Sequence, residues 1–146
     1  MLGRLFSIVA LGATLLAPSV APAQTADPTG VWMNDKGDTK VRVSRCGAAL
    51  CGTVAWLGKP TDAGGQPKTD RHNPDAAKRH RRLIGLPVLL GMKPAGGARW
   101  SGHIYNADDG NTYVSRVTLA NANSLQVQGC VLGGLFCKSM TWTRTN

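Results

Sequence analysis

Two cysteine pairs, each enclosing a short turn, most constrain what this chain can fold into. Residues 41–56 read VRVSRCGAALCGTVAW, with apolar and polar residues alternating on either side of Cys46 and Cys51. This period of two is typical of half-buried strands, so the segment predicts a β-hairpin with residues 47–50 as its loop. A loop of this length brings the two flanking cysteines opposite each other, at a separation that suits a disulfide.

The same arrangement occurs near the C-terminus. Residues 125–128 (LQVQ) lead to Cys130, a Gly-Gly turn follows, and Cys137 precedes the strand-like segment SMTWTR. The hairpin argument favours Cys46–Cys51 with Cys130–Cys137, and pairing across the two hairpins is the alternative. Neither spacing is the C-x2-C typical of zinc sites, so we expect disulfides and no metal.

The N-terminal segment has the features of a secretory signal peptide. Arg4 supplies a positive charge, residues 5–16 form a mostly apolar run, and A-P-A at residues 21–23 fits a cleavage site. The run is shorter than the ~20 apolar residues of a membrane-spanning helix. We therefore expect residues 1–23 to be removed on export. The remaining chain, residues 24–146, then forms one periplasmic or secreted domain, in an oxidising compartment that suits its four cysteines.

The composition is strongly basic. The 17 Lys and Arg residues outnumber 8 acidic residues, all of them Asp, and the formal net charge is +9. Removing Arg4 with the signal peptide leaves 9 − 1 = +8. Such a charge favours anionic surroundings, such as lipid head groups or acidic partners, although general solubility is an equally simple explanation. The export signal argues against nucleic acid as a partner.

Turn signals divide the remaining chain into about eight strands, nearly all joined by short connections. The exception begins at residue 58, where a glycine- and proline-rich loop leads to Asn73-Pro74-Asp75. Asn at an N-cap, Pro at the first helical position and Asp near the positive helix end predict a short helix over residues 76–82. Consecutive antiparallel strands form either a closed barrel or a sandwich. Because closure removes exposed edges, we predict an all-β, up-and-down antiparallel β-barrel.

The alternation of residues also predicts which side chains face inward. We place the four tryptophans, Trp32, Trp56, Trp100 and Trp142, on inward faces. Tyr105 falls on the outer face, together with His103. Phe136, Met140 and Trp142 share one face of the last strand. A small barrel is filled by its side chains by default, but these tryptophans can also line a ligand cavity.

Two further motifs carry resemblances to known families. Gly30-x-Trp32 on the first strand, with Arg144 just before the C-terminus, resembles the lipocalin (calycin) signature. That resemblance implies that Trp32 plugs one barrel end beneath Arg144, with Gly30 beside it as part of a structural site. A guanidinium stacked over an indole gains about 0.5–2 kcal/mol of cation–π energy.

The second resemblance spans the whole predicted mature chain. The motifs are C-G-x-x-L-C-G at residues 46–52, N-P-D at 73–75, W-x-G at 100–102, G-C-V-L-G at 129–133 and W-x-R at 142–144. In this order they look like the bacterial exported family DUF2147. The resemblance implies a small β-barrel and carries no assigned enzymatic activity. Residues 82–84 depart from it, because relatives are expected to have a Pro there and often another Cys.

Residues 68–82, KTDRHNPDAAKRHRR, form the most basic segment of the chain. Arginine binds phosphate and carboxylate groups in a bidentate manner, and long loops are often functional. We predict that this segment binds an anionic ligand. The alternative is a solvated cap in which Asp70 and Asp75 pair with neighbouring arginines. The candidate site residues are Arg71, His72, Asn73, Asp75, Lys78, Arg79, Arg81 and Arg82.

No motif for catalysis is present. There is no G-x-S-x-G, no Glu to form a carboxylate pair with Asp, and the three histidines are too scattered to hold a metal. We therefore expect an exported envelope protein that binds a small amphipathic or anionic ligand, which is lipid-like by analogy with lipocalins. We expect no cofactor and, by default, a monomer. The alternative is an interaction module whose segment 68–82 docks on anionic lipid or an acidic protein. An unrecognised hydrolase is the third hypothesis.

Overall fold

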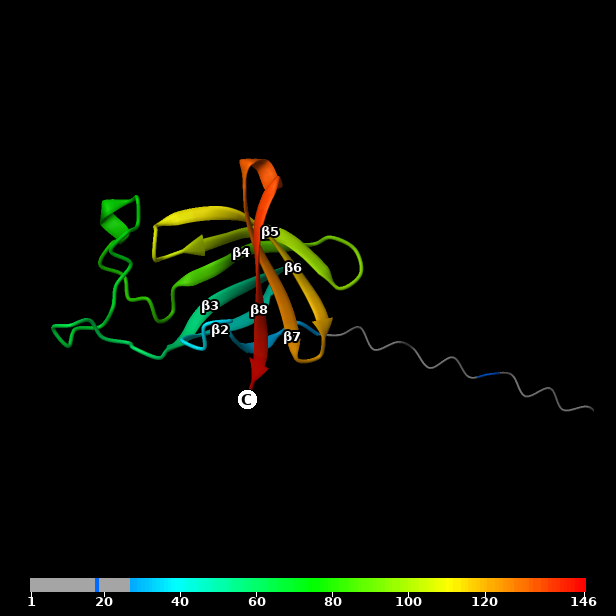
Figure 1. Ribbon diagram of the computed structural model, residues 1–146, viewed down its shortest axis with the longest axis horizontal. Helices are drawn as coiled ribbons and strands as arrows, with labels where there is room; N and C mark the ends of the chain where they lie inside the picture. Colours follow the sequence, from blue (N-terminus) through cyan, green and yellow to red (C-terminus); the bar gives the residue numbers. More distant parts are fainter. Residues whose placement is uncertain (1–17, 19–26) are drawn as a thin grey trace, which may run out of the picture.

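Eight antiparallel strands close into a barrel in the computed structural model, which describes residue 18 and residues 27–146 (Figure 1). Each strand pairs with its neighbour in sequence, and β1 closes the barrel against β8. The predicted up-and-down barrel of about eight strands is confirmed. The strands are β1 Gly30–Met33, β2 Thr39–Cys46, β3 Ala49–Leu57, β4 Pro87–Pro94, β5 Arg99–Asn106, β6 Asn111–Asn121, β7 Ser124–Val131 and β8 Phe136–Thr145.

The helical content is limited to two short 3-10 turns in the described residues, η1 Ala76–Lys78 and η2 Leu132–Gly134. None of the described helices is long and apolar enough to cross a membrane. The signal peptide predicted for residues 1–23 lies, apart from Pro18, outside the described part of the chain.

The up-and-down topology gives the barrel two different ends, because alternate connections lie at the same end. Residues 47–48, 95–98 and 122–123 connect strands at one end, where the chain also enters β1. Large side chains fill this end: Leu50, Met92 and Leu125 are each at most 2% exposed. The connections 34–38, 58–86, 107–110 and 132–135 all lie at the opposite end. Figure 1 shows the long connection (green) and the β5–β6 turn (yellow) on that same side.

Trp32 lies at the filled end and is completely buried. Its indole N–H donates a hydrogen bond to the carbonyl of Pro28 (2.9 Å), and the guanidinium of Arg144 lies 4.3 Å from the ring centroid. Arg144 also donates to the carbonyls of Thr29, Asp27 and Ala122, at 2.6, 2.8 and 2.6 Å. One arginine thereby joins the chain entry, the β6–β7 turn and the Trp32 ring.

Each cysteine pair forms a disulfide within its own hairpin, Cys46–Cys51 and Cys130–Cys137. The second pair is directly cross-strand, as expected. The first is not, because β2 and β3 continue to Cys46 and Ala49 and leave a turn of only residues 47 and 48. Cys51 is therefore opposite Ser44, and the disulfide runs diagonally across the hairpin with a Cα–Cα distance of 5.8 Å.

The predicted helix over residues 76–82 is wrong. Only the single turn η1 forms, and its N-cap is Asp75, whose carboxylate accepts from the Ala77 N–H. The predicted cap, Asn73, instead accepts from the N–H of Asp75. Beyond η1 the chain turns at residues 79–80 and then pairs with the first half of the same connection, through an isolated bridge between Thr69 and Arg82.

Trp56 was predicted to face inward but is 41% exposed. The pairing of β2 with β3 shifts between Lys40 and Val41, so Ala55 is an extra residue on β3. Such a bulge reverses the alternation of faces beyond it. Leu57 therefore packs against the core, while Trp56 faces out beneath the ammonium group of Lys40 (5.5 Å). Trp32, Trp100 and Trp142 face inward as predicted.

Candidate functional site

A cavity of about 1140 Å3 occupies the half of the barrel opposite Trp32. Small-molecule pockets are commonly about 300–1,000 Å3, so this space can hold a ligand of lipid size. Three of the four connections at this end, 34–38, 58–86 and 107–110, contribute lining residues. The strand ends beside the fourth connection, Val131 and Phe136, do so as well, and the cavity therefore opens at this end. We call residues 34–38, 58–86, 107–110 and 132–135, with the strand ends that they join, the open end.

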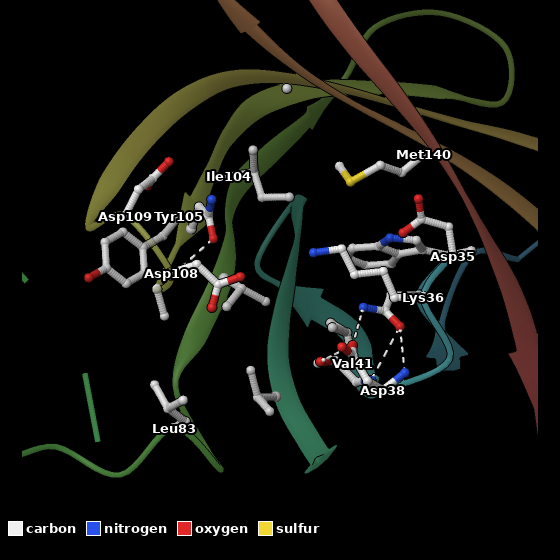
Figure 2. A pocket seen from close by; sticks show the side chains of 18 of the residues that line it. Asp35, Lys36, Asp38, Val41, Leu83, Ile104, Tyr105, Asp108, Asp109 and Met140 are labelled. Carbon is white, nitrogen blue, oxygen red and sulfur yellow. Dashed lines mark hydrogen bonds between the residues drawn. The ribbon is translucent and has the colours of Figure 1, made fainter. Parts of the chain in front are cut away.

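The inner wall of the cavity is apolar. Figure 2 shows Val41, Ile104 and Met140 around the same space, with Asp35 and Asp38 on one side and Asp108 and Asp109 on the other. Val41, Val54 and Val88 are also part of the hydrophobic core, so the wall and the core are continuous. The apolar lining residues are Val41, Val54, Leu57, Leu83, Leu86, Val88, Ile104, Met140 and Trp142. Such a wall binds hydrocarbon and gives little to a fully polar ligand.

Trp142 places one polar group in this wall. The side chain lines the cavity and is 4% exposed, and its indole N–H has no hydrogen-bond acceptor among the described residues. An unsatisfied buried donor costs about 1–3 kcal/mol. The nitrogen atom itself has almost no accessible surface, so it is shielded from the open part of the cavity. Trp142 is the only tryptophan among the lining residues.

Charged side chains surround the mouth of the cavity. Lys36, Lys59, Lys68 and Lys138 lie among the lining residues, together with Asp35, Asp38, Asp108 and Asp109. The salt bridges found among the described residues involve none of these four lysines. The ammonium groups can therefore pair with an anionic group of a ligand.

Two of the rim carboxylates accept hydrogen bonds within their own turns. Asp38 accepts from the side-chain amide of Asn34 at 2.7 Å, and this bond holds its pKa below the usual value despite partial desolvation. Asp109 accepts from the hydroxyl of Tyr113 at 2.6 Å. Its pKa is also low, because that bond and the N–H of Asn111 outweigh the desolvation that raises it. Both acids remain ionised and are held within their own turns. The other rim charges are the four lysines and the carboxylates of Asp35 and Asp108.

The long connection is fastened to the open end through a buried carboxylate, Asp70. Asp70 accepts from the hydroxyl of Tyr105 (2.6 Å), the side-chain amide of Asn73 (2.8 Å) and the guanidinium of Arg81 (3.0 Å). Tyr105 was predicted to face solvent but is only 9% exposed, because the connection covers this face of β5. Sequence alternation cannot show that a distant loop covers an outer face.

The ionisation of Asp70 and Tyr105 follows from this arrangement. Burial raises the pKa of Asp70, but the hydrogen bonds from Tyr105, Asn73 and Arg81 outweigh it and bring the pKa below 3.8. Burial, and then the hydrogen bond to Asp70, raise the pKa of Tyr105 to about 12. At neutral pH the pair is therefore a carboxylate and a neutral phenol, which is the combination that the hydrogen bond requires.

A second close contact holds the connection against the β5–β6 turn. Gly110 has φ +74°, and a Cβ placed there would collide with the carbonyl oxygen of His72. The turn and the connection can approach this closely only because residue 110 is glycine. The long connection is therefore a fixed part of the open end, and its Lys68 and Leu83 line the cavity.

The residues predicted to bind an anion do not converge on one site. Asp75 pairs with Lys78 (3.6 Å), Arg79 donates to the carbonyl of Asn73 (2.8 Å), and Arg81 binds Asp70. Arg71 donates to the ring of His72 (3.0 Å), and Arg82 is exposed on the opposite branch of the connection. None of them lines the cavity. In most of these residues the polar groups already bind within the connection itself.

No group of three or more His, Cys, Asp or Glu side chains suited to a metal ion occurs among residues 27–146. His103 is exposed, and His72 lies in the long connection. Both cysteine pairs are oxidised, so neither pair supplies thiolate ligands.

The closed barrel, the Trp32–Arg144 stack and the single open end define a small lipocalin-like β-barrel, stapled by two hairpin disulfides. The chain belongs to the family described as "Uncharacterized protein conserved in bacteria (DUF2147)", which matches residues 30–144. Both resemblances found in the sequence are thereby confirmed at the level of family and fold.

Among solved structures, the chain is similar to protein HP1028 from the human pathogen Helicobacter pylori, which is described as belonging to the lipocalin family. The TM-score is 0.72 at 23% identity, over 84% of this chain and 85% of that one, and at this identity the similarity shows the fold. A redesigned β-barrel matches at a TM-score of 0.47 and 14% identity, over 81% of this chain and 91% of that one. No curated protein matches the sequence significantly.

Sequence reasoning missed most of the cavity rim. Lys36, Lys59, Asp108 and Lys138 were treated as turn or strand residues, although a signal for them was available. In an up-and-down barrel, alternate connections meet at one end, so turns 34–38 and 107–110 necessarily face the long connection across the barrel mouth. Phe136, expected on the same face as Met140 and Trp142, does line the cavity but is 64% exposed, because the β7–β8 hairpin extends beyond the barrel wall.

Proposed function

We propose that this protein is an exported carrier that binds one amphipathic ligand, with the apolar part inside the barrel and an anionic head group at the lysine-bearing rim. The observation that carries the proposal is the cavity of about 1140 Å3, apolar in its wall and charged at its mouth. A cavity with one apolar and one charged region complements a molecule with the same division, such as a fatty acid or a lipid with a single acidic head.

The electrostatics support an anionic head group. The four rim lysines form no salt bridge within the described residues, and two of the four rim acids, Asp38 and Asp109, accept hydrogen bonds from their own turns. The formal net charge of residues 24–146, 9 − 1 = +8 without Arg4, adds a long-range attraction for anions.

The two disulfides support export, because disulfides form and persist in oxidising compartments. The signal peptide predicted for residues 1–23 would supply the route. A carrier of a poorly soluble ligand is of use where that ligand must cross an aqueous space, and a bacterial periplasm is such a space.

The test uses a fatty acid brominated on its chain, added to the predicted mature protein purified without detergent. Bromine quenches indole fluorescence at short range, and Trp142 is the only tryptophan in the cavity wall. We expect saturable quenching with a 1:1 stoichiometry. In Trp142→Phe, the saturable quenching should be largely lost, because the three remaining tryptophans lie outside the cavity.

A variant that fills the cavity makes the test specific. Ile104→Trp places a larger side chain in the wall and should weaken binding at least about tenfold, as expected when the volume for several methylene groups is lost. The matched control is Ile84→Trp, on the exposed long connection and outside this cavity. Equal binding by wild type and Ile104→Trp would contradict the proposal, as would quenching that never saturates.

The alternative, an interaction module that docks through residues 68–82, has less support. Lys78, Arg79 and Arg81 make contacts within the connection, and Arg71 donates to the ring of His72. The basic side chains of the segment without such a contact are Lys68, His80 and Arg82. If it is correct, Arg71→Ala with Arg82→Ala should reduce binding to an acidic partner without changing fatty-acid binding. No specific observation favours a hydrolase.

A further inference from the structure

The β7–β8 hairpin carries an exposed apolar tip at the open end. Val131, Leu132, Leu135 and Phe136 are 46%, 69%, 79% and 64% exposed. They account for four of the six exposed large hydrophobic side chains found in the described part of the chain. Figure 1 shows this hairpin (orange to red) extending past the neighbouring strands. We call residues 131–136 the hairpin tip.

The backbone of the hairpin tip includes an unfavourable conformation. Leu132 has φ +51°, the only positive φ at a non-glycine residue in the described part of the chain. A positive φ is unfavourable for leucine, so the surrounding structure must hold this residue in place. The Cys130–Cys137 disulfide closes the base of the tip, and Gly133 and Gly134 provide two further positive φ angles. In this conformation Leu132 and Leu135 are the two most exposed large hydrophobic side chains of the described residues.

Positive charge lies at the base of the tip. A Cβ on Gly134 would be 3.0 Å from Nη2 of Arg116, and Nη1 of the same arginine lies 3.7 Å from Sγ of Cys137. Lys138 follows directly on β8 and is exposed. A protruding apolar tip with two cations at its base, Arg116 and Lys138, matches an anionic membrane, whose hydrocarbon lies beneath phosphate groups.

From this geometry we infer that the hairpin tip inserts into the surface of an anionic lipid membrane and brings the cavity mouth to the bilayer. Val131 and Phe136 belong both to the tip and to the cavity lining, so they connect the inserted surface with the interior of the barrel. The membrane contact does not require a ligand. A role of this membrane contact in loading or unloading a lipid rests on the proposed function.

The experiment measures co-flotation of the predicted mature protein with vesicles, in the absence of added ligand. Vesicles contain equal parts of phosphatidylglycerol and phosphatidylcholine, or phosphatidylcholine alone. We expect binding to the mixed vesicles and much weaker binding to the neutral ones. The test variant is Leu132→Asn with Leu135→Asn, because both side chains are exposed, neither lines the cavity, and asparagine tolerates a positive φ.

The double variant should bind mixed vesicles at least about tenfold more weakly, the effect expected for the loss of one buried leucine side chain. The matched control, Ile84→Asn, removes an exposed apolar side chain from the long connection and should bind like wild type. Arg116→Gln with Lys138→Gln should retain residual binding but lose the preference for phosphatidylglycerol.

Equal flotation of wild type and the leucine double variant would overturn the inference, as would failure of wild type to bind the mixed vesicles. If wild type instead forms a dimer that the double variant abolishes, the tip binds a second copy and the membrane assignment is wrong. Fatty-acid binding in solution separates this inference from the proposed function. The leucine double variant should retain fatty-acid binding. Ile104→Trp should have weakened fatty-acid binding but should still float with the mixed vesicles.

Discussion

At the scale of single residues, two side chains carry most of the structural specificity. Arg144 joins three chain segments over the Trp32 ring, and Asp70 joins the long connection to Tyr105. Both are polar groups that satisfy several partners at once, and both act on parts of the chain far apart in sequence. Removing either side chain should therefore lower the free energy of unfolding by more than the loss of an average surface contact does.

Trp32→Ala should destabilise the barrel strongly. The side chain is fully buried and carries the stack with Arg144, so we expect a loss of about 3–5 kcal/mol in the free energy of unfolding. Urea denaturation followed by circular dichroism measures it. Trp56→Ala is the matched control, because that indole is 41% exposed and should matter much less. Similar losses for both variants would show that Trp32 does not close the barrel end.

Asp70→Asn should change the acid dependence of stability. The folded-state pKa of Asp70 lies below its unfolded value, so its contribution is present above pH ~4 and is lost as pH falls through the folded-state pKa. Near neutral pH the variant should be about 1.5–3 kcal/mol less stable, since hydrogen bonds to a charged group are lost. The difference should shrink in strong acid.

Urea denaturation of wild type and Asp70→Asn at a series of pH values gives this difference directly. Asp62→Asn is the control, because Asp62 is exposed in a turn whose hydrogen bonds an asparagine can also accept. A stability difference that stayed constant down to the lowest pH would mean that the carboxylate of Asp70 is not the group responsible.

At the scale of elements, both hairpins could be predicted from the sequence, but which side chains face the core could be predicted only in part. Alternation with bounding cysteines identified both stapled hairpins, because strand period and disulfide reach are local properties. The outward turn of Trp56 depends on a bulge opposite Lys40, and burial of Tyr105 depends on a loop more than thirty residues away. The helix beyond residue 78 was lost to pairing between Thr69 and Arg82. Tertiary contacts decided all three, and no local pattern encodes them.

The docking of the long connection is testable through one glycine. Gly110→Ala should displace residues 71–82 from the β5–β6 turn, because the new Cβ would collide with the carbonyl of His72. Limited trypsin digestion should then cleave faster at the basic residues of the connection. Gly37→Ala controls for backbone strain, since its φ of +71° is close to the +74° of Gly110 and it has no neighbour within 4 Å. Equal digestion of the two variants would contradict the docked arrangement.

At the scale of the whole molecule, the barrel combines a sealed end with an open one. Trp32 and large apolar side chains fill the first, whereas four connections surround an apolar cavity at the second. The sequence predicted the barrel and both disulfides. It left open whether the barrel has a cavity, because the volume left by side chains depends on their packing across the barrel. The residues predicted to bind an anion lie on the long connection, outside the cavity lining.

The measurement that tests the carrier proposal most directly is native mass spectrometry of the mature protein purified from its own envelope without detergent. We predict a mass above that of the oxidised polypeptide by one small amphipathic molecule. After delipidation, added palmitate should restore a 1:1 complex in wild type and not in Ile104→Trp. A spectrum of the bare polypeptide that stays unchanged when palmitate is added would contradict a ligand-binding barrel.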